Sequence, residues 1–544
     1  MEILNLTLPA PNRFATGYFE GNTLIQDFFH YDYKKENHYA ERLKELGTRQ
    51  FFRNELADHI DEFMSRYPSS DQVRDNLRKL RQKNSVAVIG GQQAGLFTGP
   101  LYSLHKVISI IKLAEQKEAE LGVPVVPVFW IAGEDHDFQE INHVYVMNTN
   151  KPEKRVFPQK QLEKKMASEL YLDQEVCRNW VEGIIETYGE TEHTKDLLSF
   201  TEQQLLKSET IVDFFASVIM EIFKDHGLLI IDSGNSGLRK LEKEYFSRQI
   251  KNHEAITASV LHQQKEKEAA GFQKAMDISP NAINLFYYDR INNERILLQS
   301  DPEGKLLTGK NGEVSFTEGA LLEIASEHPE KLSNNVVTRP LMQEWLFPVL
   351  AFIGGPGEIA YWSELKLVFE HFGMKMPPLV PRLNITLLDR SIERDIEELG
   401  LDLSEVLTAG TEKFELRYID SIKDRELEVL FEKTKEQLEE NYRMIRTRMS
   451  SSYPALLSLL EKNEDVLLGQ IDFMEKKTEE SACRKNDAVL RKFSKINHAL
   501  RPLGIPQERV WNPFWYFNRY GMDFVSELIA QNLTFDGTHK VVKM

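Results

Sequence analysis

The sequence predicts an α/β protein whose core is a doubly wound parallel sheet, interrupted by two insertions and followed by an α-helical antiparallel coiled-coil domain. Two observations lead to this prediction. Short, continuously apolar runs that end in glycines alternate with helical segments, as buried parallel strands do. Nearer the C-terminus, apolar residues recur every three or four positions among many charges, which is typical of paired helices.

The strand signals come first along the chain. Residues 86–91 form an apolar run that ends in glycine, a helix follows over about 100–120, and residues 125–132 form a second buried strand. Residues 228–232 and 349–353 repeat the pattern, and each runs into glycines. We expect parallel pairing, because strands separated by a helix are joined by a crossover. The order of the strands does not follow from the sequence.

Changes of composition give the expected domains. Residues 1–390 form the core, of which the first 80 are polar and largely helical, with insertions at about 155–225 and 250–335. Residues 391–505 form the helical domain, and residues 506–544 form an aromatic segment that packs back on the core.

Two helical runs in the second domain, 427–449 and 456–474, flank a break at 450–454. We expect an antiparallel hairpin of coiled-coil type, which is a natural element for dimerisation. The alternative is two ordinary amphipathic helices packed on the core, because Thr434 and Asn463 interrupt the apolar seam.

Composition excludes several classes of protein. The formal net charge of −17 argues against broad binding to nucleic acid or acidic lipid. Cys177 and Cys483 are too far apart for a zinc ribbon or a disulfide framework, which fits a reducing cytoplasm. The N-terminus does not resemble a secretory signal, and the richest apolar stretches are too short to span a bilayer. We therefore expect a cytoplasmic protein that neither inserts into membranes nor binds zinc.

The loop after the first strand is the first candidate binding site. Its glycines would allow a ligand to approach the backbone, and the following helix offers its N-terminus to an anion. We expect Thr98 to cap that helix, and His105 and Lys106 to face phosphates. The spacing matches neither G-x-G-x-x-G nor the Walker pattern, so a glycine-rich packing turn is the alternative. The candidate binding residues are Gly91, Gln92, Gln93, Gly95, Thr98 and Gly99.

Four ionisable residues follow the second strand, at the edge where open α/β sheets bind ligands. Glu134, Asp135, His136 and Asp137 could hold Mg²⁺, bind a substrate ammonium or supply a general base. The zinc-protease spacing H-E-x-x-H is absent. A solvated loop or a helix cap is the alternative.

The strand at 349–353 also runs into glycines, and a helix is expected from there to about residue 372. An acidic residue in its first turn would favour the helix dipole. The aromatic residues Tyr361 and Trp362 either line a pocket or belong to the core. Arg382, which follows the apolar pair 379–380, either binds a carboxylate through two parallel hydrogen bonds or is a surface charge. The candidate residues are Gly355, Gly357, Glu358, Tyr361, Trp362 and Arg382.

The aromatic C-terminal segment offers a second candidate nucleotide site, in which a base stacks on a tryptophan and arginines approach the phosphates. We favour the alternative, in which these rings pack the segment onto the core. The candidate residues are Arg509, Trp511, Asn512 and Arg519.

Taken together, these motifs resemble the family of cysteine ligases of bacillithiol biosynthesis, nearly from end to end. The similarity rests on Gly90–Tyr102, Gly133–Asp137 and Gly354–Glu358, with Tyr361 and Trp362. The resemblance implies a Rossmann-like core with connecting-peptide insertions, a coiled-coil domain that supports a homodimer, and a cytoplasmic enzyme. The implied reaction joins the cysteine carboxyl to the glucosamine amine of glucosaminyl malate, the last step to bacillithiol.

That fold is similar to class I aminoacyl-tRNA synthetases. Their His-x-Gly-His and Lys-Met-Ser-Lys-Ser signatures are absent here, since only His105 lies near the first. The fold likeness therefore does not establish adenylate chemistry.

The leading hypothesis is a ligase that forms an amide with ATP and Mg²⁺, because a free carboxylate must be activated before an amine displaces its oxygen. The loop at 90–106 would hold the nucleotide, with His105 and Lys106 stabilising transferred charge. The charged cluster at 134–137 would orient the cysteine ammonium, bind Mg²⁺ or deprotonate the amine, and Arg382 would hold the malate carboxylates.

Two alternatives stay open: a class I synthetase-like nucleotidyltransferase acting on another small acid, and a nucleotide-binding coiled-coil interaction protein. The sequence does not decide whether ATP is the activator, whether AMP or ADP is released, where the nucleotide pocket lies or how the thiol is recognised.

Overall fold

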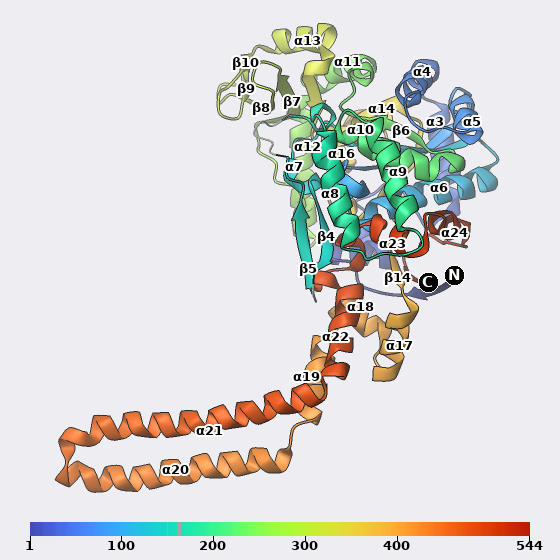
Figure 1. The fold of residues 1–544 in the computed structure, drawn as a ribbon. Coiled ribbons are helices and arrows are strands. Elements are labelled where there is room, and N and C mark those ends of the chain that lie inside the picture. The colour runs from blue at the N-terminus through green and yellow to red at the C-terminus, as the bar shows by residue number, and fades with distance from the viewer. Residues whose placement is uncertain (149–150, 160–164) are drawn as a thin grey trace. The chain divides into compact units, whose positions relative to one another are not determined.

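The computed structural model divides into two compact units of chain (Figure 1). The first unit joins Met1–Leu388 to the C-terminal Gln507–Met544, and the second is Asp389–Pro506. The structure describes residues 1–148, 151–159 and 165–544.

A five-stranded sheet forms the centre of the first unit, and all its neighbouring strands are parallel, as predicted. Its order is β13-β12-β2-β3-β6. The chain proceeds from β2 through β3 to β6 on one side, and then places β12 and β13 on the other. The strand order therefore reverses between β2 and β12, which is where open α/β sheets bind ligands. The strands are β2 (Val86–Gln92), β3 (Val125–Ile131), β6 (Leu229–Asp232), β12 (Val349–Gly354) and β13 (Leu379–Pro381).

Helix α6 (Leu101–Leu121) is the crossover between β2 and β3, and it packs on both of these strands. It begins after Pro100, whose fixed φ suits a helix start, and ends at Gly122, which has a left-handed φ of 65°. The prediction that Thr98 caps this helix is wrong, since the N-cap residue is Pro100 and no side chain caps the helix.

Both ends of the chain meet in a three-stranded sheet that the sequence analysis missed. β1 (Glu2–Leu6) pairs antiparallel with β15 (His539–Lys543), which pairs in parallel with β14 (Ile385–Leu388). The rest of the first 80 residues is largely helical, as predicted. Its helices are α1 (Arg13–Glu20), α2 (Thr23–Gln26), α3 (Glu36–Gly47), α4 (Arg53–Met64) and α5 (Asp71–Leu80).

Between β3 and β6 the described chain forms an antiparallel hairpin followed by helices. These elements are α7 (Phe138–Ile141), β4 (His143–Asn148), β5 (Lys151–Val156), α8 (Gln174–Glu186), α9 (Thr194–Leu206) and α10 (Ile211–Phe223).

Between β6 and β12 the chain adds helices and a second sheet, of order β10-β9-β8-β7-β11, whose pairs are all antiparallel. The strands are β7 (Ala282–Asp289), β8 (Glu294–Ser300), β9 (Leu307–Gly309), β10 (Ser315–Phe316) and β11 (Leu332–Asn334). The helices are α11 (Ser236–Lys251), α12 (His253–Ala269), α13 (Glu318–Glu327) and α14 (Thr338–Leu346).

The single helix expected after β12 is wrong in detail. The chain forms α15 (Pro356–Trp362) and α16 (Lys366–His371), separated by a turn. Farther along, α23 (Pro513–Tyr520) and α24 (Phe524–Ala530) carry the aromatic segment, whose rings are largely buried in the core of the first unit.

The second unit contains the antiparallel hairpin that the sequence predicts. In Figure 1, α20 (Arg425–Ser452) and α21 (Leu457–Lys485) run side by side. Lys435 of α20 pairs with Glu475 of α21 at 2.9 Å. No helix among the described residues is both long and apolar enough to cross a membrane. The other helices of this unit are α17 (Arg390–Leu399), α18 (Leu403–Ala409), α19 (Glu412–Ser421) and α22 (Asp487–Leu500).

Candidate active site

Lys106 joins the carboxyl end of β2 to the first turn of α15, the helix that follows β12, at the point where the strand order reverses. Its Nζ donates to the carbonyl oxygen of Gly91 at 2.6 Å and to Gln92 Oε1 at 3.3 Å. It also pairs with Glu358 Oε2 at 2.5 Å. A buried cation thus lies at the edge of the sheet where ligands bind in this class of fold.

Glu358 has two roles in this arrangement. It lies in the first turn of α15, as predicted, and its Oε2 accepts a hydrogen bond from the backbone N–H of Gly355 at 2.8 Å. The same oxygen is the counter-charge of Lys106. Burial lowers the pKa of Lys106, and Glu358 offsets part of that shift. The lysine is therefore a desolvated cation, which interacts with a substrate anion more strongly than an exposed one.

Glycines in the loop after β2 allow close packing of the backbone. A Cβ on Gly91 would lie 3.0 Å from the carbonyl oxygen of Trp130, and one on Gly95 would lie 2.8 Å from the Cα of Gly99. These contacts support the packing account of the loop.

The end of this loop is strained. Phe97, Thr98 and Gly99 have successive left-handed φ angles of 51°, 65° and 72°. Such a conformation is rare for a β-branched residue and costs about 1–3 kcal/mol. The hydroxyl of Thr98 is also buried with no hydrogen-bond partner in the described chain. Strain and an unpaired polar group together mark this loop as a functional candidate.

His105 lies away from that loop. Its Nδ1 is 3.1 Å from Glu508 Oε2, and the two oxygens of Glu508 also accept hydrogen bonds from Arg382 at 2.6 and 2.7 Å. Burial lowers the pKa of His105 despite the carboxylate. Arg382 thus binds a carboxylate through two hydrogen bonds, the geometry that the sequence predicts. The carboxylate is that of Glu508 in the C-terminal segment of the same unit, and not that of a substrate. Neither side chain is a surface charge.

Glu134 is held by arginines. Its Oε2 accepts a hydrogen bond from Arg239 at 2.6 Å, and its Oε1 accepts one from Arg339 at 3.1 Å. Burial alone would raise the pKa of Glu134, but Arg239, Arg339 and Arg295 outweigh it and hold the pKa below its ordinary value. The carboxylate is therefore charged and positions the arginines.

Asp135 is a half-buried carboxylate near the carboxyl end of β3. Its Oδ2 accepts a hydrogen bond from Gln93 at 2.7 Å, and Arg295 lies 3.8 Å from its Oδ1. Burial opposes ionisation, yet these partners keep the pKa of Asp135 below its ordinary value. His136 is next to it, with its ring edge-on to Phe286, whereas the exposed Asp137 caps α7.

The two aromatic candidates on α15 differ. Trp362 belongs to the core, where it packs 4.5 Å from Phe352. Tyr361 is only half buried, and burial together with the Glu358 carboxylate raises its pKa.

Sequence reasoning missed Arg239, Arg295 and Arg339, which reach Glu134 and Asp135 from α11, β8 and α14. No motif surrounds them, so their role depends on the fold. It also missed Asp232 at the end of β6, whose pKa burial raises to about 6. Its position directly after a buried strand was the available signal. Within residues 1–148, 151–159 and 165–544, no group of three or more His, Cys, Asp or Glu side chains could hold a metal ion.

The C-terminal candidates are largely part of the packing. The carbonyl oxygen of Trp511 accepts a hydrogen bond from the backbone N–H of Leu101 at 2.8 Å, at the start of α6. Asn512 caps α23 and donates to the hydroxyl of Tyr188 at 3.0 Å. Arg509 and Arg519 are exposed.

Two family models together match nearly the whole chain. The model described as "Bacillithiol biosynthesis BshC, N-terminal Rossmann-like domain" matches residues 1–383. The model of the BshC C-terminal coiled-coil domain matches residues 385–544. Proteins described as "Putative cysteine ligase BshC" are similar over 100% of both chains. They include those of Geobacillus thermodenitrificans, 44% identical over 542 residues, and of Bacillus cereus strain B4264, 42% identical over 544 residues.

Proposed function

The chain belongs to the bacillithiol biosynthesis BshC family, and from this premise we propose that it is the ligase that joins the carboxyl of cysteine to the glucosamine amine of glucosaminyl malate. We propose ATP as the activator. The carboxylate oxygen of cysteine attacks a phosphorus atom of ATP, and a phosphoanhydride P–O bond breaks to release pyrophosphate (attack at the α-phosphorus) or ADP (attack at the γ-phosphorus). The amine then attacks the activated carboxyl carbon and displaces AMP or inorganic phosphate. The C–N bond forms as the C–O bond breaks, and the amine proton passes to a base.

The observation that best supports this proposal is the position of Lys106 between the carboxyl end of β2 and the first turn of α15. A desolvated cation there would neutralise the charge that develops on a transferred phosphoryl or acyl phosphate group. The unpaired Thr98 hydroxyl lies in the same loop, where the nucleotide would bind.

Substrate roles follow from which side chains remain available. Asp135 is half buried and charged, so we assign it to the cysteine ammonium or to deprotonation of the attacking amine. Arg382 already forms an ion pair with Glu508. We therefore propose that Arg339, rather than Arg382, binds the malate carboxylates. Arg339 uses only Nε on Glu134, and its side chain is 24% exposed. Because the described residues form no dedicated metal cluster, we expect Mg²⁺ to arrive on the ATP phosphates.

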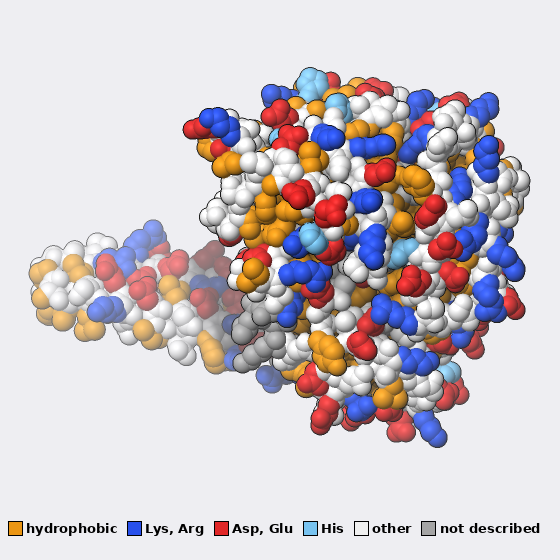
Figure 2. Space-filling model, turned by 90° about the horizontal axis from the view of Figure 1, so that it is seen from above, with side chains coloured by type: hydrophobic (Ala, Val, Ile, Leu, Met, Phe, Trp, Pro, Cys, Tyr) orange, Lys and Arg blue, Asp and Glu red, His pale blue; other side chains and the backbone are white. Residues whose placement is uncertain are grey.

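We also propose a homodimer built on the hairpin of α20 and α21. Hydrophobic side chains are exposed between charged ones on this hairpin, at the left of Figure 2. Three of them recur every seven residues on α21: Leu459 is 62% exposed, Val466 59% and Phe473 52%. Such a stripe is the seam of a coiled coil, and a second copy would cover it.

A single reaction tests the catalytic proposal. Purified protein, MgATP, cysteine and glucosaminyl malate are incubated, and a mass spectrum is read for bacillithiol and for AMP against ADP. Bacillithiol with AMP supports adenylation, and bacillithiol with ADP supports an acyl phosphate. A panel of other amino acids and amino sugars tests the alternative acceptor. No bacillithiol from a folded dimer contradicts the proposal.

A further inference from the structure

A second cavity lies at the end of the parallel sheet opposite to Lys106. It has a volume of about 770 Å³. Its walls include Lys83, which precedes β2, and Trp345, which precedes β12. Parallel strands share one direction, so their amino ends lie at the edge opposite to the candidate active site. The proposed reaction gives this cavity no role.

Cationic side chains are concentrated in this cavity. Five of them line it, against two carboxylates, although the whole chain carries a formal net charge of −17. A basic cavity in an acidic protein attracts anions locally. The cations are Arg49, Arg53, Arg81, Lys83 and Arg248, and the carboxylates are Glu55 and Glu244.

Two of these cations are already paired, Arg49 with Glu344 and Arg81 with Asp58. The other three, Arg53, Lys83 and Arg248, form no ion pair with any residue that the structure describes. They are therefore available to an external anion.

Aromatic rings hold two of the available cations in place. The guanidinium of Arg53 lies 5.3 Å from the ring centre of Phe51 and donates to Ser85 Oγ at 2.8 Å. Arg248 lies 5.6 Å from the ring centre of Tyr245. Burial lowers the pKa of Arg53, as expected for a partly desolvated guanidinium without a counter-charge. Such pre-positioned arginines bind phosphate in a forked geometry at little entropic cost.

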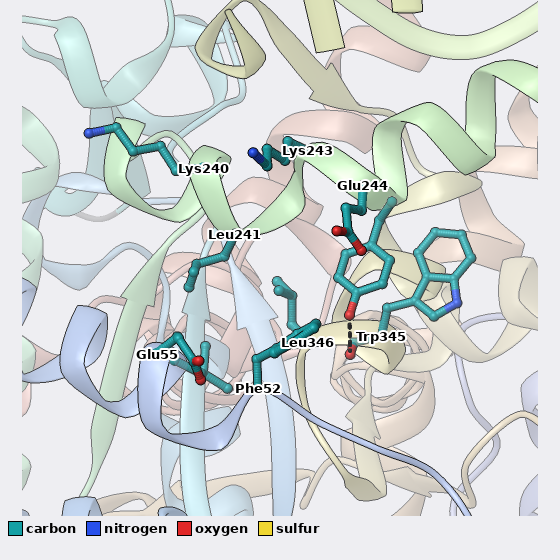
Figure 3. A pocket seen from close by; sticks show the side chains of 10 residues that line it. Phe52, Glu55, Lys240, Leu241, Lys243, Glu244, Trp345 and Leu346 are labelled. Carbon is teal, nitrogen blue, oxygen red and sulfur yellow. Dashed lines mark hydrogen bonds between the residues drawn. The ribbon is translucent and has the colours of Figure 1, made fainter. Parts of the chain in front are cut away.

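A smaller cavity of about 230 Å³, shown in Figure 3, shares part of its wall with the basic one. Its lining combines apolar and aromatic side chains with the charged Glu55, Lys240, Lys243 and Glu244. The two share Phe52, Tyr245 and Trp345 in their walls, together with the carboxylates Glu55 and Glu244. In Figure 3, Leu241 of α11 lies across the cavity from Phe52 and Leu346. Phe52 is 59% exposed, so its ring is accessible to a ligand in this cavity.

We propose that the two adjoining cavities form one binding site for a small molecule that carries phosphate groups on a flat ring system. Arg53, Lys83 and Arg248 bind the phosphates, and the ring lies against Phe52 and Leu241. The combination of unpaired cations and an exposed aromatic surface fits both halves of such a ligand. This site is separate from the candidate active site and does not depend on the proposed reaction.

Inorganic pyrophosphate tests the charged half. Hydrogen exchange of the full-length protein is expected to show protection of peptides covering residues 49–54 and 81–85 when pyrophosphate is added. In calorimetric titrations, the double variant Lys83→Gln, Arg248→Gln is expected to bind at least tenfold more weakly at this site. The matched double variant Lys251→Gln, Lys265→Gln removes two exposed cations from α11 and α12 and should bind normally.

The Lys106→Met variant separates this site from the candidate active site, because it should retain the protection at 49–54 and 81–85. Protection confined to the loop at 90–106 would overturn the proposal. So would equal loss of affinity in the two double variants, which would indicate binding through net charge alone. Hydrogen exchange on the unaltered protein locates the site even if a variant folds poorly.

ADP tests the ring half. It should bind at this site at least tenfold more tightly than pyrophosphate, and Phe52→Ser should remove that gain while leaving pyrophosphate affinity unchanged. Equal affinities for ADP and pyrophosphate, or a Phe52→Ser variant that behaves like the parent protein, would overturn the ring half of the proposal.

Discussion

At the scale of single residues, the same residue type takes different roles according to its neighbours. Lys106 is buried but reaches a carboxylate 252 positions away, at the edge of the sheet where ligands bind. His105 precedes it on α6 and instead contacts Glu508. Consecutive helical residues point in directions about 100° apart, so only one of the two can face the crevice. The sequence places both in one turn, but only the fold separates their roles.

Lys106→Met is expected to reduce bacillithiol formation by at least about 100-fold, because it removes the cation at the crevice. The loss would also leave Glu358 without its partner, so the double variant Lys106→Met, Glu358→Gln serves as a charge-balanced companion. Lys112→Met on the same helix is the control, since Lys112 pairs with Glu115 of α6 and not with the residues around Lys106 that the structure describes. Initial rates and thermal midpoints are measured together. More than a tenth of the parental rate in a folded Lys106→Met variant would contradict the assignment.

Two buried histidines are expected to make stability depend on pH. Burial lowers the pKa of His30 to about 3 and of His539 to about 4, from 6.5. Between about pH 6.5 and 4 the unfolded chain therefore binds more protons than the folded one, and stability falls as the pH falls. Each group contributes a slope of about 1.4 kcal/mol per pH unit.

Thermal midpoints recorded from pH 7 to pH 5 measure this dependence. His539→Gln should flatten the decline, because it removes a group whose pKa burial lowers. Parallel curves for His539→Gln and the parent protein would show that His539 does not titrate as inferred.

At the scale of elements, a buried ion pair connects the C-terminal segment to the parallel sheet. Arg382 directly follows β13, and Glu508 lies in the returning segment. His105 of α6 contacts the same carboxylate. Three elements that are distant in sequence therefore meet at one charge cluster. Composition indicated the packing of this segment, but it did not identify the ionic contact.

Arg382→Met is expected to cost about 3–5 kcal/mol, because it leaves the Glu508 carboxylate buried without its main partner. Hydrogen exchange of the segment 507–520 measures the local opening free energy. The exposed neighbour Arg509→Met is the control and should change it by less than about 0.5 kcal/mol. The double variant Arg382→Met, Glu508→Gln should recover part of the loss, and no recovery would argue against a charge-based cause.

At the scale of the whole molecule, the second unit presents an apolar surface that the fold of one chain leaves uncovered. In the second unit, the stripe of apolar side chains on α21 is exposed, and Figure 2 shows hydrophobic side chains among the charged ones on the hairpin. An apolar seam with a seven-residue repeat is stable when a partner helix buries it. The proposed partner is a second copy of this chain.

The triple variant Leu459→Glu, Val466→Glu, Phe473→Glu is expected to be a monomer of 63.1 kDa, whereas the parent protein should sediment at twice that mass. The reason is that three buried charges at the seam would outweigh the apolar contacts. Ser458→Glu with Lys476→Glu is the control on the same helix. An unchanged mass for the triple variant would place the dimer contact elsewhere, and a monomeric parent protein would contradict the dimer.

The sequence by itself determined the elements of this protein whose signal is local. Apolar runs such as Val125–Ile131 predicted buried parallel strands, and the spacing of apolar residues predicted the helical hairpin. Both predictions succeed because the pattern of buried side chains along a helix or strand depends on residues close together in the sequence. It also located Lys106, Asp135 and Glu358 near the strand ends. Only the tertiary structure decided the strand order, the pairing of β1 with β15, and the arrangement of Arg239, Arg295 and Arg339 around Glu134. These features depend on contacts between residues far apart in the chain, which no local pattern encodes. For the same reason, the fold alone assigned Arg382 to an internal carboxylate.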